Sequence, residues 1–224
     1  HTLDIVDVSD SSNPTLVQQY TTDDYLSSDV QVVEDTIYFR TAAVGYNTVL
    51  YRGFQIIDVS NPSSPTLLGI YDTESGYGAY NIQVVDGLAY IVSDNTVKEF
   101  ADTLQSLRIV DIHDPDTPIL LGNYVPPSGG GVWFGWTDSP VQVVSSIAYI
   151  VTGYGRLEIV DMGNSASPTV IGNYGMGTVE GVRVVDNLAY VATNEHATNV
   201  DPRADLHIVD VSDTFSPTLR GIYT

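Results

Sequence analysis

The stretch LRIVDIHDPDTPILLGNY, residues 107–124, decides the fold because its core recurs along the chain. The same core, an Ile followed by Val or Ile, then Asp, then Val, Ile or Met, also begins at Ile5, Ile56, Ile159 and Ile208. In all five copies a Pro follows the Asp by seven residues and a Tyr follows it by thirteen. Repetition at fixed spacing is the signature of a repeat architecture, in which each copy builds one structural unit.

A second phrase lies between the copies and consists of two Val residues with a Tyr five residues after the second. Its four copies run from Val32 to Tyr38, from Val84 to Tyr90, from Val143 to Tyr149 and from Val184 to Tyr190. Each phrase holds two β-rich runs around a turn signal, so each predicts a hairpin, and a full unit has four strands. Consecutive motif aspartates are 51, 53, 50 and 49 residues apart, a period typical of a β-propeller blade.

We therefore expect an all-β chain forming a single β-propeller domain over residues 1–224. Four complete four-stranded blades are predicted at residues 29–71, 81–124, 140–174 and 181–223, with the first strand of each innermost and the fourth outermost. Residues 3–20 carry only the last two strands of a unit, so they predict an N-terminal half blade. In the first strand of each blade, the second Val should be buried between blades, as should the first Ile of every third strand. These residues are Val33, Val85, Val144 and Val185, and Ile5, Ile56, Ile109, Ile159 and Ile208.

The motif (Leu/Phe)-x-Ile-(Val/Ile)-Asp-(Val/Ile/Met), followed by a strand such as Ser216-Pro217-Thr218-Leu219, resembles the LVIVD-repeat family of β-propeller proteins over nearly the whole chain. The resemblance implies a module of a bacterial or archaeal surface protein, and hence an extracellular or cell-surface location. It carries over no catalytic residue, because no active-site motif of that family has a counterpart here.

The half blade leaves the inner edge of its third strand without a partner, and proteins rarely leave such an edge open. The chain also begins at His1 without an initiator Met, so we expect a processed product or a segment of a longer protein. Two routes would cover the edge. Upstream chain could complete a larger ring, or a neighbouring copy could add strands and give a homo-oligomer or filament.

Composition excludes several function classes. The chain has 28 acidic and 8 basic residues, a net charge of −20, and such a polyanion repels nucleic acid and anionic lipid surfaces. It has no Cys, which removes disulfides and cysteine metal sites. Because no run approaches about 18 apolar residues, we expect no membrane span.

The two variable connections of each unit, from the fourth strand to the next first strand and from the second to the third, emerge on the same face. Loops on a rigid scaffold commonly carry binding sites, although surface loops also tolerate drift. The longest connection holds Trp133, Phe134 and Trp136 beside a triple glycine. These aromatics would bind a glycan or a protein partner, or alternatively fold back as a small satellite core.

Acidic residues also gather in these connections, where flexible oxygen ligands suit calcium. The candidate ligands, all within twelve residues, are Asn194, Glu195, Asn199, Asp201 and Asp205. A solvated acidic surface is the alternative. Ca²⁺ is the one cofactor that the sequence suggests.

Other conspicuous residues have structural explanations in the repeat. Each motif Asp ends a strand, where its carboxylate can accept a hydrogen bond from the backbone two residues on. His207 shares its register with Asp4, Gln55, Arg108 and Glu158, and we expect this polar position to face solvent.

No nucleophile elbow, phosphate loop or dinucleotide motif occurs, so the sequence favours a non-catalytic extracellular scaffold or interaction module. The alternative is a propeller-type glycan hydrolase or lyase whose acidic site lies on the face with the long loops.

Overall fold

The computed structural model describes residues 1–45, 48–73, 77–95, 106–127, 131–132, 140–177, 179–195 and 203–224. Within these ranges every regular element is a β-strand. No helix there is long and apolar enough to span a bilayer.

The strands form one two-stranded and four four-stranded antiparallel sheets. The N-terminal hairpin pairs β1 (Thr2–Asp7) with β2 (Thr15–Thr21). Blade 1 consists of β3 (Tyr25–Val33), β4 (Thr36–Gly45), β5 (Thr48–Asp58) and β6 (Thr66–Asp72). Blade 2 consists of β7 (Tyr77–Val85), β8 (Leu88–Asn95), β9 (Ser106–Asp111) and β10 (Ile119–Tyr124). Blade 3 consists of β11 (Val141–Val144), β12 (Ile147–Thr152), β13 (Arg156–Asp161) and β14 (Thr169–Gly175). Blade 4 consists of β15 (Val179–Val185), β16 (Leu188–Glu195), β17 (Arg203–Asp210) and β18 (Thr218–Tyr223).

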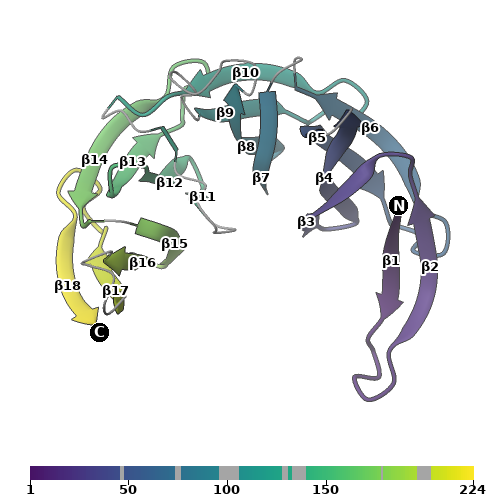
Figure 1. Cartoon of the computed structure of the whole chain (residues 1–224), viewed down its shortest axis with the longest axis horizontal. Helices are drawn as coiled ribbons and strands as arrows, with labels where there is room; N and C mark the ends of the chain where they lie inside the picture. The colour runs from purple at the N-terminus through teal and green to yellow at the C-terminus, as the bar shows by residue number, and fades with distance from the viewer. Residues whose placement is uncertain are drawn as a thin grey trace.

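The sheets stand side by side in an open arc, with β3, β7, β11 and β15 on the inside and β6, β10, β14 and β18 on the outside (Figure 1). The predicted all-β propeller, with four blades and an N-terminal half blade, is confirmed. In Figure 1 the β1–β2 hairpin lies at one end of the arc and blade 4 at the other.

The strand register shows which turns lie at the same end of each blade. Leu188 pairs with Val185 across the first hairpin turn and with Asp210 at the end of β17. The turn from first to second strand and the turn from third to fourth strand therefore share one face, which we call the turn face. The first residue of each first-to-second-strand turn adopts positive φ, between 49° and 55°, at Glu34, Asp86, Ser145 and Asp186. The other two connections leave from the opposite face, which we call the loop face.

The core lies between neighbouring sheets. The predicted third-strand residues Ile56, Ile109 and Ile159 are fully buried there. Ile5 and Ile208, in the sheets at the two ends of the arc, are only half-buried. Ile5 and Ile208 are less buried because each of these end sheets has a neighbouring sheet on one side only.

The assignment of the first-strand valines is wrong by one residue in blades 2, 3 and 4, whereas in blade 1 the first valine, Val32, is 59% exposed and the predicted Val33 is the more buried of the two. Val84, Val143 and Val184 are buried, whereas Val144 and Val185 are 40% and 51% exposed. Val33 and Val85 are partly buried. The second valine adjoins the turn and points to the other side of the sheet, where the rim of the neighbouring blade covers it only in part.

Candidate functional site

The turn face is built by the motif aspartates. At each one, carboxylate Oδ1 accepts a hydrogen bond from the backbone N–H two residues on, as predicted from the sequence. The donors are Ser9 at 2.8 Å, Ser60 at 2.8 Å, His113 at 3.0 Å, Gly163 at 2.8 Å and Ser212 at 2.9 Å. These aspartates therefore close turns.

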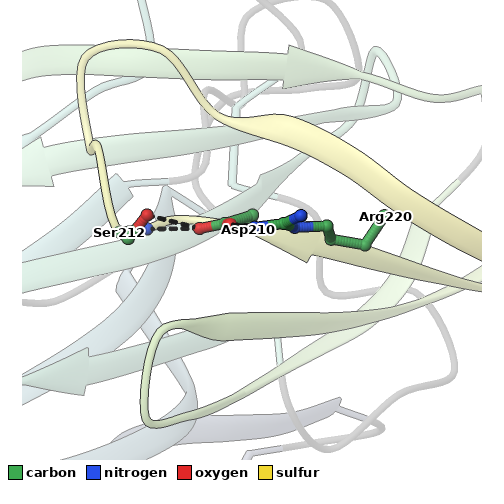
Figure 2. A network of polar contacts seen from close by, with 3 residues as sticks. All are labelled: Asp210, Ser212 and Arg220. Carbon is green, nitrogen blue, oxygen red and sulfur yellow. Dashed lines mark hydrogen bonds and ion pairs between the residues drawn. The ribbon is translucent and has the colours of Figure 1, made fainter.

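Asp210 makes the most extensive contacts of this kind (Figure 2). Its Oδ1 accepts from Ser212 N and, at 2.6 Å, from Ser212 Oγ, while Oδ2 accepts from Arg220 Nε at 2.9 Å and from a second guanidinium nitrogen. The hydrogen bonds from Ser212, with those from Arg220, lower the pKa of Asp210 to about 2. The carboxylate is thus held ionised by groups of its own blade.

His113 occupies the turn position of a serine in other copies. Its Nδ1 lies 2.7 Å from Asp111 Oδ1, and its ring covers Gly87, where an added Cβ would lie 2.5 Å from Nε2. Its ring therefore packs against the neighbouring turn of its own blade.

The polar register of the third strands is buried, which corrects the expectation that it faces solvent. Gln55, Arg108 and Glu158 are at most 6% exposed, and His207 is half-buried. Only Asp4, in the N-terminal hairpin, is exposed. No feature of the sequence signals this burial directly, because the five residues share polarity but neither size nor charge.

The partner of this register is the repeating Tyr of the preceding sheet. Tyr20 Oη donates to Gln55 Oε1 at 3.2 Å, and Tyr124 Oη donates to Glu158 Oε2 at 2.5 Å. Burial, reinforced by the hydrogen bond to Glu158, raises the pKa of Tyr124 far above its usual value. At Tyr20 and Tyr124 the repeating Tyr thus connects one sheet to the next.

At the inner ring, a glutamine in the first strand of blades 1, 2 and 3 bonds both backbone groups of a valine in the first strand of the next blade. Gln31 contacts Val84, Gln83 contacts Val143, and Gln142 contacts Val184. We call these contacts the glutamine clamps.

The predicted aromatic site of Trp133, Phe134 and Trp136 lies outside the described residues. Its flanks are described. Val132 is fully buried and forms a β-bridge with Thr152 of β12. On the other side, the carbonyl of Pro140 accepts a 2.8 Å hydrogen bond from Val151 N. Both ends of the segment are therefore fixed to the same strand of blade 3.

The predicted calcium ligands fall only partly in the described residues. Asn199 and Asp201 lie outside them. The backbones of Asn194 and Glu195 extend β16 and pair with Ala204 and Arg203 of β17. Oδ1 of Asp205 is buried without a hydrogen-bond partner. Among the described residues, no three His, Asp or Glu side chains gather closely enough to hold a metal ion, so the calcium site stays a prediction.

A cavity of about 350 Å³ opens between blades 2 and 3. It is lined by the turn residues Asp86 and Ser145 and by Tyr90 and Met162, among others. These residues place it at the turn face, not at the loop face where binding was predicted. Its lining combines one carboxylate, several hydroxyl groups and apolar side chains. Such a lining does not by itself specify a reaction.

Comparison with known proteins gives a consistent picture of the repeat. The family model described as "LVIVD repeat" matches residues 1–22, 49–73, 100–125, 139–175 and 176–224. No curated protein matches the chain.

Solved structures share the fold at low sequence identity. A chain in the structure of S. cerevisiae Dbp5 bound to Nup159, Gle1, IP6 and ADP matches with a TM-score of 0.55 and 12% identity, over 94% of this chain and 50% of that chain. The N-terminal domain of Nup159 matches with a TM-score of 0.55 and 11% identity, over 94% and 51%. This chain thus spans about half the length of these two structures, and the likeness concerns the fold alone.

Proposed function

The chain belongs to the LVIVD-repeat family, and from that premise we propose that it is a non-catalytic interaction module which presents its loop face to a partner at the cell surface. The turn face repeats the same aspartate turn in every sheet. The loop face carries all the variation in connection length. A rigid frame with one variable face is the usual arrangement of binding scaffolds.

The observation that carries the proposal is the anchoring of the segment between Val132 and Pro140. Val132 is buried against β12, and Pro140 bonds to the same strand. The described residues on both sides of Trp133, Phe134 and Trp136 are therefore attached to one blade. Aromatic side chains supply a large contact area at a low cost in conformational entropy. We propose that they contact a protein partner.

Intrinsic fluorescence provides a direct test, because Trp133 and Trp136 are the only tryptophans of the chain. Once the emission of the titrant alone is subtracted, tryptophan emission therefore reports on this segment. Titration with a partner protein captured from a cell-surface fraction should shift or quench the emission. The Trp136→Phe variant should bind more weakly with an unchanged melting temperature. Binding that is unaffected by replacing both tryptophans would refute the role of the segment. A response to purified cell-wall polysaccharide, but not to proteins, would instead identify a glycan-binding face.

The proposed location is supported by the absence of Cys and by the net charge of −20, which suits a hydrated external surface. Protease treatment of intact cells tests it. The module should be cleaved from intact cells if it is exposed, and a protein that is protected until lysis would contradict a surface location.

A further inference from the structure

The three interfaces between complete blades use the same close contact, whereas the N-terminal hairpin has Gln18 in this register. In the outermost strands, Gly69, Gly122 and Gly172 each face a backbone carbonyl in the third-to-fourth-strand turn of the next blade. An added Cβ would lie 1.8 or 1.9 Å from the oxygens of Pro115, Ser165 and Thr214 respectively. Only glycine permits this approach, so the glycine marks a face on which another blade packs.

Blade 4 keeps this docking face, and within the part of the chain that the structure describes no element packs on it. Gly221 occupies the glycine register, and no atom lies within 4 Å of a Cβ added there. Tyr223 occupies the register of Tyr71 and Tyr124, which are both buried, yet it is 75% exposed. We call the surface of β17 and β18 around Gly221 and Tyr223 the C-terminal face.

The N-terminal hairpin shows the complementary surface. Val6 and Val8 are 44% and 66% exposed, whereas the equivalent residues of blades 2 to 4 are buried against the preceding blade. Those equivalents are Val110, Val160 and Val209, and Ile112, Met162 and Val211. Asp4 stands exposed in the register of Gln55 and Glu158, the two acceptors of tyrosine hydroxyls. We call the surface of Asp4, Val6, Val8 and the turn carbonyl of Ser11 the N-terminal face.

Charge favours the same pairing. In the register of the glutamine clamps blade 4 has Arg183, which is exposed. In the register of Leu68 and Ile171, which pack at interfaces between blades, it has Arg220, whose side chain is 65% exposed. Arg220, one of the eight basic residues of a chain with net charge −20, thus lies at the C-terminal face, while Arg183 lies on the innermost strand β15 of the same blade. The N-terminal face presents a carboxylate.

We propose that the C-terminal face of one chain binds the N-terminal face of a second copy, in the geometry of the interfaces within the chain. Tyr223 Oη then donates to the Asp4 carboxylate of the second copy, and the Ser11 carbonyl packs against Gly221. Val6 and Val8 are covered by β17. Because the two faces differ, the contact is heterologous, and it generates a closed ring or a filament according to the rotation between copies. This inference deepens the proposed scaffold function by adding a partner for the two ends of the arc.

Two single substitutions test the contact, each on one face. Gly221→Val fills the docking face where nothing lies within 4 Å, so the chain itself still folds. Val8→Arg places a cation opposite Arg220 at a site that is already exposed. Each should weaken association by roughly ten- to a hundredfold in sedimentation velocity over a concentration series. Gly175→Val is the matched control, because Gly175 also has no atom within 4 Å and lies in an outermost strand away from the C-terminal face.

Mixing the two variants separates this proposal from any symmetric dimer. Gly221→Val retains a working N-terminal face, and Val8→Arg retains a working C-terminal face. Each alone should be a monomer, while the mixture should form a dimer that grows no further. A wild-type chain that stays monomeric at millimolar concentration, or a mixture that does not dimerise, would overturn the proposal. Since the assay uses purified chain only, its failure leaves binding at the loop face untouched, and loss of loop-face binding leaves this assembly intact.

Discussion

The hydroxyl of Tyr124 on β10 donates a 2.5 Å hydrogen bond to Oε2 of Glu158 on β13, so the outermost strand of blade 2 is joined to the third strand of blade 3. Both residues are buried. Tyr20 and Gln55 form the equivalent contact between the N-terminal hairpin and blade 1. A polar bond inside an apolar interface fixes the relative position of two blades, because sliding would break this hydrogen bond to a buried carboxylate.

We expect Tyr124→Phe to lower the free energy of unfolding by about 1–3 kcal/mol, since it removes a bond to a buried carboxylate and keeps the ring. Urea unfolding measures the change. Tyr154→Phe is the control, because Tyr154 is 68% exposed. Equal stability of both variants would show that the contact adds nothing to the interface.

We expect Gly122→Ala to destabilise blades 2 and 3, because its Cβ would lie 1.9 Å from the Ser165 oxygen. Backbone must then shift, and overpacking of this kind costs roughly 1–3 kcal/mol or more. Gly221→Ala is the matched control in the same register, where no atom lies within 4 Å. Calorimetry should show a lower melting temperature for the first variant only. A normal melt of Gly122→Ala would mean that the blades are more loosely packed than the structure has them.

The sequence was sufficient for the strand order because the interval from Asp to Pro to Tyr never changes. It also predicted the aspartate turns, since a carboxylate at a strand end has few other backbone donors in reach. It could not predict which side of a strand is buried. Both sides of a propeller sheet are covered, so the alternation of polar and apolar residues carries less information than in a sheet with one wet face. Val143 and Val144 show this, because both are apolar and only the first is buried.

The burial of Glu158 and Arg108 was equally hidden. A charged residue in a strand normally indicates a solvated position, and the exception at Glu158 depends on Tyr124 from another blade. The aromatic and calcium predictions on the loop face concern side chains that lie largely outside the described residues.

Stability should depend on the ionisation of Asp210. Its pKa of about 2 in the folded state is below the ordinary 3.8, so its contribution is fully present above pH 4 or so and is lost as pH falls towards 2. Carboxyl NMR titration should give a midpoint near 2 for Asp210. The stability difference between wild type and Asp210→Asn should shrink over that interval. A midpoint at the ordinary value would show that the contacts with Ser212 and Arg220 do not persist in solution.

Calcium should raise the melting temperature if the segment from Asn194 to Asp205 binds it, because a ligand of the native state stabilises by mass action. The melting temperature is compared between a solution with chelator and one with millimolar calcium. Magnesium at the same concentration controls for screening of the net charge of −20. A melt that is identical in all three solutions would remove the metal hypothesis, and Asp205→Asn should abolish any effect specific to calcium.

The glutamine clamps should contribute more to the free energy of unfolding than their partial exposure suggests. Gln83 Nε2 donates to the Val143 carbonyl at 3.0 Å, and Val143 N donates to Gln83 Oε1 at 2.7 Å. One side chain thus satisfies both the N–H and the carbonyl of Val143, a residue of the innermost strand of blade 3. Gln83→Met keeps the length of the side chain but leaves both groups without this partner, and we expect a loss of about 1–3 kcal/mol. Arg183→Met is the matched control, because Arg183 has the same register in blade 4 and is exposed, and it should change stability by less than about 0.5 kcal/mol. Amide hydrogen exchange locates the effect, since protection of Val143 N–H should fall in the Gln83 variant while that of Val160 N–H, in the middle of β13, stays high. Unchanged protection at Val143 would show that the inner ring is held by apolar packing alone.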